Sequence, residues 1–390
     1  LSPSFPGIPI YLNIYVLCFA FFASTEILFS LWFFQLFAIM EQGLLSRIGL
    51  FSTAGSVVQG GLTGMQYMGG VVLFVVWIIW TARRHLKTVW LSAWSGIKTA
   101  GESDELFSYR RALIGLIAGS TYVLFWLNQV GLSIYIGVFF LTAMFTFYLA
   151  LARAVAESGL IMAELTVKSN YFTVGVIGSA NMDMGDINTL GMANGFARNA
   201  RTFSMIGFSH IAWLKSRMKG PRQGLFFWIC VSFGLSAAVS IVSMIHSGHM
   251  LGANNLWTTP GNFGNFFYGR VPVWASNASQ IGGLEILFFV SGILVNGLVI
   301  AGRVWFSWWP FHPIGMAIGD VGSVVRNAFF PLFLAWLIQT LLMRFGGVRL
   351  YQAAQPFFLG MLVGFLMGIG LSIGVDMIWF PATPHRTEWF

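Results

Sequence analysis

The run GGLTGMQYMGGVVLFVVWIIWTA, residues 60–82, decides the fold class. It contains no charged side chain, and it is long enough to cross the hydrocarbon core of a bilayer, which takes about 20 apolar residues in a helix. Arg83, Arg84 and His85 follow it directly. Basic residues collect at the cytoplasmic ends of membrane spans. The run therefore predicts a transmembrane α-helix.

The composition of the whole chain extends this prediction. Of 390 residues, 57% are hydrophobic and 9% are charged, against about 25% charged in an ordinary soluble domain. So few polar side chains cannot coat a soluble domain, and we expect an all-α, polytopic bundle in a lipid bilayer. The formal charge of +8 then indicates basic cytoplasmic loops and no nucleic-acid partner. Cys18 and Cys230 lie in apolar runs, which argues against a disulfide framework or a thiolate metal cluster.

Further apolar runs predict eight to ten spanning or half-spanning helices, some broken or re-entrant, in a single integral membrane domain over residues 1–390. The runs are 8–22, 27–40, 112–129, 132–152, 225–245, 284–301, 329–343 and 356–380. The first two are each short for a crossing, so they form either two tilted helices or one broken helix. Because the chain begins at Leu1, we expect it to be the C-terminal part of a longer chain.

The distribution of basic residues orients the bundle. Residues 83–111 contain six Lys or Arg and residues 153–223 contain eight, whereas 246–282 contain only Arg270. The positive-inside bias places the first two stretches on the cytoplasmic side and the third on the opposite side, together with the uncharged turn 128–131. Residues 153–223 are also rich in Gly and Asn, with apolar pieces too short to span. They form either a re-entrant segment that lines a polar cavity or an ordinary cytoplasmic loop.

Ionisable side chains in apolar surroundings are the candidates for a solute or ion pathway, because each is costly at membrane depth. Glu26 stands between two apolar runs, and Glu285 begins another. Arg153 and Glu157 are spaced i, i+4 on a predicted helix that leaves the membrane. Their pair is either an exposed salt bridge of little energetic weight or the mouth of the pathway.

The segment WWPFHPIG, residues 308–315, cannot continue a regular helix, since each proline removes a hydrogen-bond donor and clashes with the preceding turn. It is either a Trp-anchored interfacial turn or a broken helix whose free carbonyls face a solute or ion; in the second case residues 304–328 cross the membrane. His312 is its only titratable side chain. With an ordinary pKa near 6.5, His312 would bind an anionic group or pass a proton toward Glu285.

Several strings carry a resemblance to known sequences. SLWFF at 30–34, ARAVAESG at 152–159, WPFHPIG at 309–315 and QPFFLG at 355–360 resemble those of an uncharacterised family of bacterial multispanning membrane proteins. That family is distantly reminiscent of the oligopeptide-transporter superfamily. The resemblance implies a polytopic helical fold in a bacterial inner membrane, and it implies no substrate or binding residue.

The motifs of hydrolases, zinc enzymes and nucleotide-binding loops are missing, so we expect no enzymatic activity, no cofactor and no metal. We expect a secondary transporter of a small polar or peptide-like solute that works by alternating access. The alternative is a non-catalytic structural or accessory subunit that packs against itself or other membrane proteins. A water-accessible cavity lined by Glu26 or Glu285 would favour the transporter. The candidate pathway residues are Glu26, Glu285, His312, Arg153, Glu157, Asn181 and Asn194.

Overall fold

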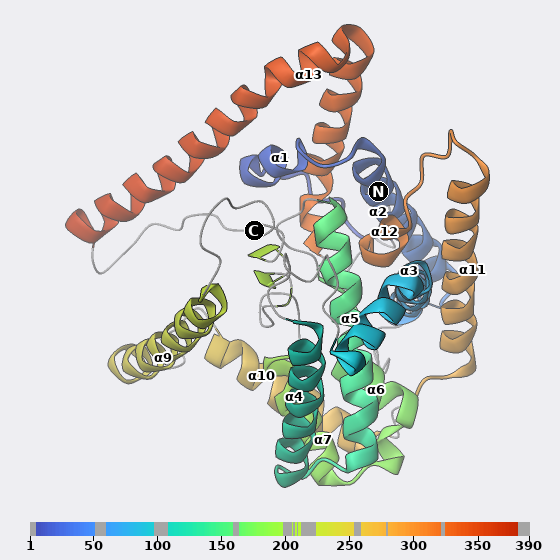
Figure 1. Ribbon diagram of the computed structural model, residues 1–390, viewed down its shortest axis with the longest axis vertical. Coiled ribbons are helices and arrows are strands. Elements are labelled where there is room, and N and C mark those ends of the chain that lie inside the picture. The colour runs from blue at the N-terminus through green and yellow to red at the C-terminus, as the bar shows by residue number, and fades with distance from the viewer. Residues whose placement is uncertain are drawn as a thin grey trace.

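The computed structural model describes residues 5–50, 60–96, 108–158, 164–197, 205, 207–208, 210–211, 224–252, 259–277, 280–320 and 324–380. These residues form helices and no strand (Figure 1). Within them, seven helices are long and apolar enough to cross a membrane, which confirms the predicted all-α polytopic fold. They are α2 (Thr25–Arg47), α3 (Gly61–Ser95), α4 (Tyr109–Gln129), α5 (Ile134–Ser158), α9 (Leu225–Leu251), α11 (Gly283–Trp305) and α13 (Val324–Trp379). The shorter helices are α1 (Ile14–Ala20), α6 (Ser169–Ile177), η2 (Ser179–Asn181), α7 (Met184–Met192), η3 (Ala193–Gly195), α10 (Thr259–Ser276) and α12 (Pro313–Ile318).

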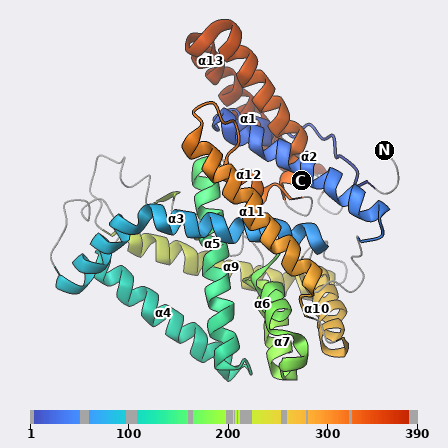
Figure 2. The same cartoon turned by 90° about the vertical axis from the view of Figure 1, so that its right-hand side faces the viewer.

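Helices α3 and α11 pack backbone to backbone and run in the same direction, crossing as Figure 2 shows. Gly292 lies against the carbonyl of Gln66, where a side chain would overlap the oxygen. One turn further along both helices, buried Asn296 donates from Nδ2 to the carbonyl of Gly70 at 2.7 Å. Small residues allow such close approach of helices in a membrane, where apolar surface alone gives no preference for protein over lipid.

Helix α2 runs antiparallel to α3. The Tyr67 hydroxyl donates to the carbonyl of Phe34 at 2.7 Å, and the Gln42 amide donates to Thr63 Oγ1 at 3.0 Å. A later residue of α2 thus contacts an earlier residue of α3. The start of α2 therefore lies toward the same end of the bundle as the ends of α3 and α11.

The first two apolar runs form a short helix, α1, followed by one span, α2. The break leaves carbonyls without helical partners, and carbonyls that are buried need another donor. Gln339 of α13 supplies the partner: its amide nitrogen donates to the carbonyls of Phe21 at 2.6 Å and Ala23 at 2.9 Å. Its oxygen accepts from Thr25 Oγ1 at 2.8 Å. One buried side chain thus holds the broken pair against α13.

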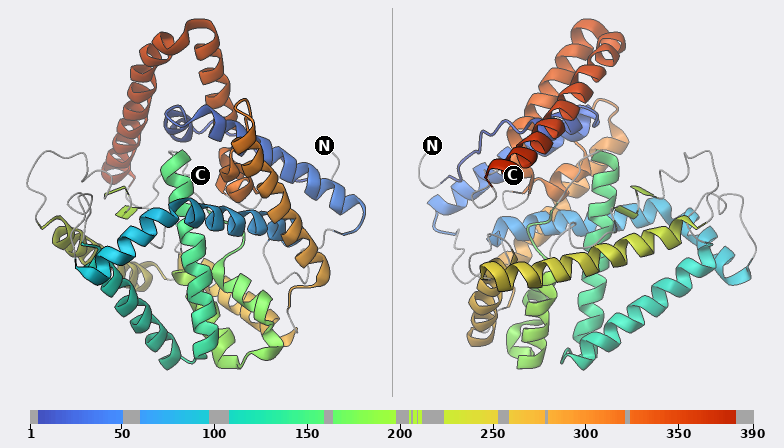
Figure 3. Two further views of the ribbon diagram at one scale, coloured as in Figure 1. Left: turned by 45° about the vertical axis from the view of Figure 1, so that its right-hand side comes forward. Right: turned by 90° about the vertical axis from the view of Figure 1, so that its left-hand side faces the viewer.

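The predicted spans 329–343 and 356–380 are two arms of α13. They meet at Gly347, whose φ of 59° and ψ of −162° suit glycine and few other residues. The first arm packs against α2, and the second extends away from most of the bundle (Figures 1 and 3). The basic turn at residues 344–349 lies at this bend.

Helices α6, η2, α7 and η3 form a short hairpin against α5. At its tip, Asp186 accepts from the backbone N–H of Ser133 at 2.6 Å, and the Tyr135 hydroxyl donates to the carbonyl of Asn181 at 3.3 Å. At its base, the Tyr148 hydroxyl donates to the carbonyl of Phe196 at 2.7 Å. The hairpin thus covers the half of α5 nearest the α4–α5 turn. Residues 97–107, 159–163, 198–204, 206, 209 and 212–223 of the two basic stretches lie outside the described residues.

Candidate functional site

Ionisable side chains from three spans meet just before α12. Arg153 and Glu157 form an ion pair along the last turns of α5. Glu157 Oε2 lies 3.6 Å from Nε2 of His312. At the start of α2, Glu26 lies 2.8 Å from the guanidinium of Arg303 at the end of α11. The structure therefore brings four predicted candidates together and adds Arg303, which the sequence analysis missed.

Pro310 and Pro313 flank His312 and keep it out of a continuous helix. Pro313 occupies the first turn of α12, where its missing N–H costs nothing, and His312 is the N-cap. The ring accepts at Nδ1 from the N–H of Ile314 at 3.2 Å. The N–H of His312 donates to Ser30 Oγ at 2.6 Å, and that hydroxyl donates to the carbonyl of Glu26 at 2.7 Å.

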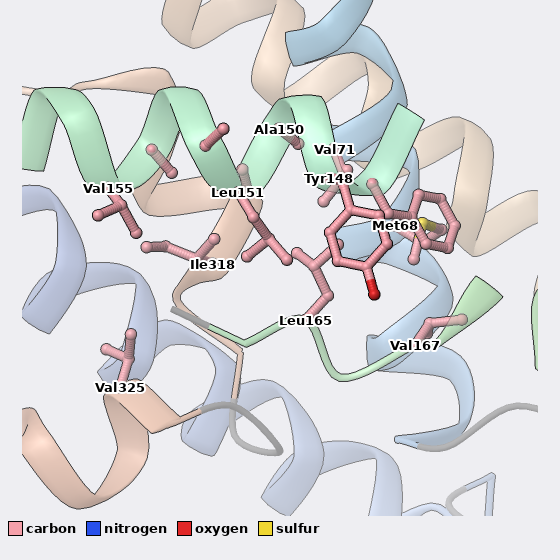
Figure 4. Packing of buried hydrophobic residues seen from close by; sticks show 14 of the residues in the cluster. Met68, Val71, Tyr148, Ala150, Leu151, Val155, Leu165, Val167, Ile318 and Val325 are labelled. Carbon is pink, nitrogen blue, oxygen red and sulfur yellow. The ribbon is translucent and has the colours of Figure 1, made fainter. Parts of the chain in front are cut away.

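Helix α12 itself is buried throughout, between α2, α3 and α11. Gly315 lies so close to Phe34 of α2 that a side chain would collide with the ring. Figure 4 shows Ile318 packed beside Leu151 and Val155 of α5. A Trp-anchored surface turn would leave this segment exposed. The geometry instead favours a broken helix inserted into the bundle, while Trp308 just before it remains exposed.

The Nε2 atom of His312 faces Glu157 but forms no hydrogen bond with it. Because Nδ1 accepts a hydrogen bond, the proton of the neutral ring lies on Nε2, toward Glu157 Oε2. A separation of 3.6 Å is too long for a hydrogen bond. In the described part of the chain, the buried Oε2 atom of Glu157 has no hydrogen-bond partner. A hydroxyl, an amide or a water molecule beside the two atoms would give both of them a hydrogen-bond partner.

The charge on His312 is disfavoured at neutral pH. The residue lies outside the seven candidate spans, yet its side chain is buried. Burial, followed by the positive charges of Arg303 and Arg153, lowers the pKa of His312 from 6.5 to about 4. The lowered pKa of His312 favours the neutral imidazole at pH 7, in which Nε2 is a donor toward Glu157.

The exposure of the ionisable side chains decreases from Glu26, Arg303 and Arg153 to the half-buried Glu157 and the buried His312. The side chains of Glu26 and Arg303 are 54% and 37% exposed, and that of Arg153 is 51% exposed. Solvent-exposed pairs of this kind contribute less than about 1 kcal/mol to stability. The three exposed side chains are therefore better suited to meeting a charged group than to holding the fold.

The other three candidates lie elsewhere. Glu285 caps the start of α11, accepting from the N–H of Gly282 at 2.5 Å, and it is separated from Arg303 by most of that helix. Exposed Asn181 donates to the carbonyl of Ile177 at 2.8 Å, near the hairpin tip. Asn194 is buried at the hairpin base, and its Oδ1 has no hydrogen-bond partner among the described residues. None of these geometries connects the residue with His312.

A second polar cluster, also missed, lies beyond the other end of α12. With its amide nitrogen toward Glu41, Gln66 donates to both carboxylate oxygens at 2.5 and 2.7 Å. In its matching orientation, buried Gln35 donates to the carbonyl of Asp320 at 3.0 Å. Asp320 is 2% exposed and, with Tyr67, lines a cavity of about 10 Å³, room for roughly one water molecule. Within the described ranges, no three His, Cys, Asp or Glu side chains gather closely enough to hold a metal.

Comparison with known proteins gives one match. A family model described as a family of unknown function, DUF6785, matches residues 3–384. No curated protein and no solved structure matches the chain. The match includes every helix described above, and it agrees with the resemblance to an uncharacterised family.

Proposed function

Since the chain belongs to this family of unknown function, we infer its activity from its own side chains and propose a secondary transporter of a small polar or peptide-like solute in a bacterial inner membrane. The observation that carries the proposal is the open contact between Glu157 Oε2 and His312 Nε2. An unsatisfied buried polar group costs about 1–3 kcal/mol. A solute that donates to the carboxylate and accepts from the imidazole recovers this cost, which gives it affinity for the site.

Alternating access needs an element that moves between two packings. Helix α12 suits this role because it is short, lacks continuous helical connection at its start, and carries ionisable groups beyond both ends. Gly315 and Gly319 present a smooth face to Phe34 of α2. Movement of α12 along that face would alter the contact of His312 with Glu157 at one end and the surroundings of Asp320 at the other.

Ligand-dependent thermal stability tests the proposal even while the solute is unidentified. Purified protein is screened by thermal unfolding against the amino acids and a panel of dipeptides and tripeptides. We expect at least one compound to raise the melting temperature of the wild type and to drive saturable uptake into proteoliposomes. Glu157→Gln should lose both effects, because the neutral amide cannot replace the carboxylate.

Glu285→Gln is the matched control, since it makes the same chemical change at the exposed start of α11, most of that helix away from Arg303. It should keep the solute response. Equal responses in Glu157→Gln and Glu285→Gln would remove Glu157 from the pathway. If no compound on the panel affects the wild type, the transporter proposal for these solutes is wrong.

One observation favours the structural alternative. In the span Leu225–Met250 of α9, none of the most apolar window is buried, and the second arm of α13 extends from the bundle with many apolar side chains exposed. Either lipid or other membrane proteins cover such surfaces. A subunit role predicts a stable assembly in mild detergent, with no solute response in the same screen.

A further inference from the structure

The last part of α3 leaves the bundle as an exposed helix. Its 35 residues span about 52 Å at 1.5 Å per residue, against a hydrocarbon core of about 30 Å. The buried residues of its first half end at Val75, and most side chains from Ile79 to Leu91 are exposed. The helix therefore continues from a span into the region of the lipid headgroups.

Aromatic and basic side chains share one face of this extension. Trp80, Arg83, Lys87, Trp90 and Trp94 follow spacings of three and four residues, which place them along one side of an α-helix. All five are exposed, including the three large indoles. Another face packs toward α4, where the ring of His85 lies 6.3 Å from that of Tyr109. We call the five-residue face the Trp/basic stripe.

Arg83 is held in position before any ligand arrives. Its guanidinium lies 4.5 Å from the centre of the Trp80 ring, and its Nη1 donates to the carbonyl of Trp80 at 2.8 Å. Lys87 lies one turn further along the same face, so the two cationic residues are neighbours on the helix surface. The planar guanidinium and the flexible ammonium both donate to phosphate oxygens.

We propose that the Trp/basic stripe binds the headgroup of an anionic phospholipid, with its phosphate between Arg83 and Lys87. Trp side chains favour the boundary between acyl chains and headgroups, and Trp80, at the end of the apolar run and three residues before Arg83, is suited to that boundary. Basic residues next to a span are drawn to the anionic lipids of the cytoplasmic leaflet. Residues 80–96 contain no Asp or Glu. Over residues 83–111, six basic side chains outnumber three acidic ones, which lie outside the described residues.

The partner is expected to be a lipid because α3 continues without a break from its apolar run to Arg83. Arg83 directly follows the apolar run of α3, so it cannot move far from the membrane surface while that run stays in the hydrocarbon. A soluble partner would have to compete there with headgroups already in contact with the stripe. The site is separate from His312 and does not depend on the transporter proposal.

Thermal unfolding in nanodiscs tests the assignment. Full-chain protein is compared in phosphatidylcholine alone and in a mixture with phosphatidylglycerol. The wild type should melt several degrees higher in the mixture, with a smaller difference at high salt. Arg83→Gln/Lys87→Gln should lose most of this difference. Lys87→Arg keeps the charge and should retain it.

Arg344→Gln/Arg349→Gln is the matched control, since it removes equal charge at the α13 bend, away from the stripe. It should keep the lipid effect. Equal loss in both double variants would overturn the site, because general surface charge would then explain the effect. If Arg83→Gln/Lys87→Gln does not fold, Lys87→Gln is measured instead. A wild-type shift produced by inorganic phosphate in phosphatidylcholine alone would overturn a lipid in favour of a free anion.

Discussion

One ring nitrogen of His312 forms a structural hydrogen bond, and the other faces Glu157 without forming one. Its Nδ1 caps α12, while its Nε2 faces Glu157 across 3.6 Å. Because the folded pKa is about 4 and the unfolded value is about 6.5, folding disfavours the protonated ring. The resulting stability is complete above pH of about 6.5 and is lost as the pH falls from there toward about 4.

We therefore predict that His312→Asn weakens this acid sensitivity. Asn is a good N-cap, so it keeps the contact with the N–H of Ile314 while removing the titrating ring. Melting temperatures measured between pH of about 7 and about 4 should fall less steeply for His312→Asn than for the wild type. His249→Asn, at an exposed histidine of α9, serves as control and should follow the wild type. Parallel curves for His312→Asn and the wild type would contradict the assignment.

Sequence reasoning found individual residues of the site and missed their partners. His312 and Glu157 were visible because each interrupts or ends an apolar run. Arg303 was missed because a basic residue after a span is ordinary under the positive-inside bias. Glu41 and Asp320 each stand at the edge of an apolar run, where a carboxylate has no evident role. Glu41 and Asp320 come close together only because α12 is inserted between α2 and α3.

At the scale of helices, the contact of α3 with α11 depends on glycine at the crossing. Gly292→Ala would place a methyl group on the carbonyl oxygen of Gln66, whereas Gly297→Ala meets only the flexible end of Leu73 at 3.5 Å. We expect Gly292→Ala to lower stability by about 1–3 kcal/mol through overpacking. Gly297→Ala should be neutral or slightly stabilising, since Ala favours helix by up to about 1 kcal/mol.

Thermal unfolding of the two variants in the same detergent measures this difference. Both substitutions add one methyl group to the same helix, so their difference isolates the crossing contact from helix propensity. If Gly292→Ala unfolds at or above the temperature of Gly297→Ala, the close packing of α3 on α11 is incorrect.

Helix centres were predictable, and helix ends were not. The apolar run ending at Ala82 identified α3, but charge ends a run without ending a helix, since Arg and Lys are good helix formers. Residues 246–282 are rich in Gly, Asn and Pro, a composition that is typical of loops. They nevertheless contain α10, with Pro272 inside it, packed where Val271 meets Gly191 of α7. Tertiary contact there outweighs local propensity.

At the scale of the whole molecule, the helices bring charged side chains from several spans to one end of the bundle. The start of α2 and the ends of α5 and α11 meet through Glu26, Glu157 and Arg303. The basic extension of α3 packs toward the start of α4, at the end of that helix away from the α4–α5 turn. The tip of the α6–α7 hairpin contacts Ser133 at the opposite end of α5. The sequence left 153–223 as either a loop or a re-entrant segment, because its short apolar pieces are compatible with both.

The hairpin gives a topology prediction. On a Cys18→Ser/Cys230→Ser background, single cysteines are introduced at Ser95, Asn181 and Ser276, all exposed positions. Asn181→Cys and Ser276→Cys should react with an impermeant maleimide from the same side of the membrane, because Asn181 and the end of α10 lie together: Ser179 donates to the carbonyl of Asn277 at 2.9 Å. Ser95→Cys should react from the opposite side, shown by comparing right-side-out with inverted vesicles. If Asn181→Cys and Ser95→Cys react from the same side, residues 153–223 are a cytoplasmic loop and the re-entrant interpretation is wrong.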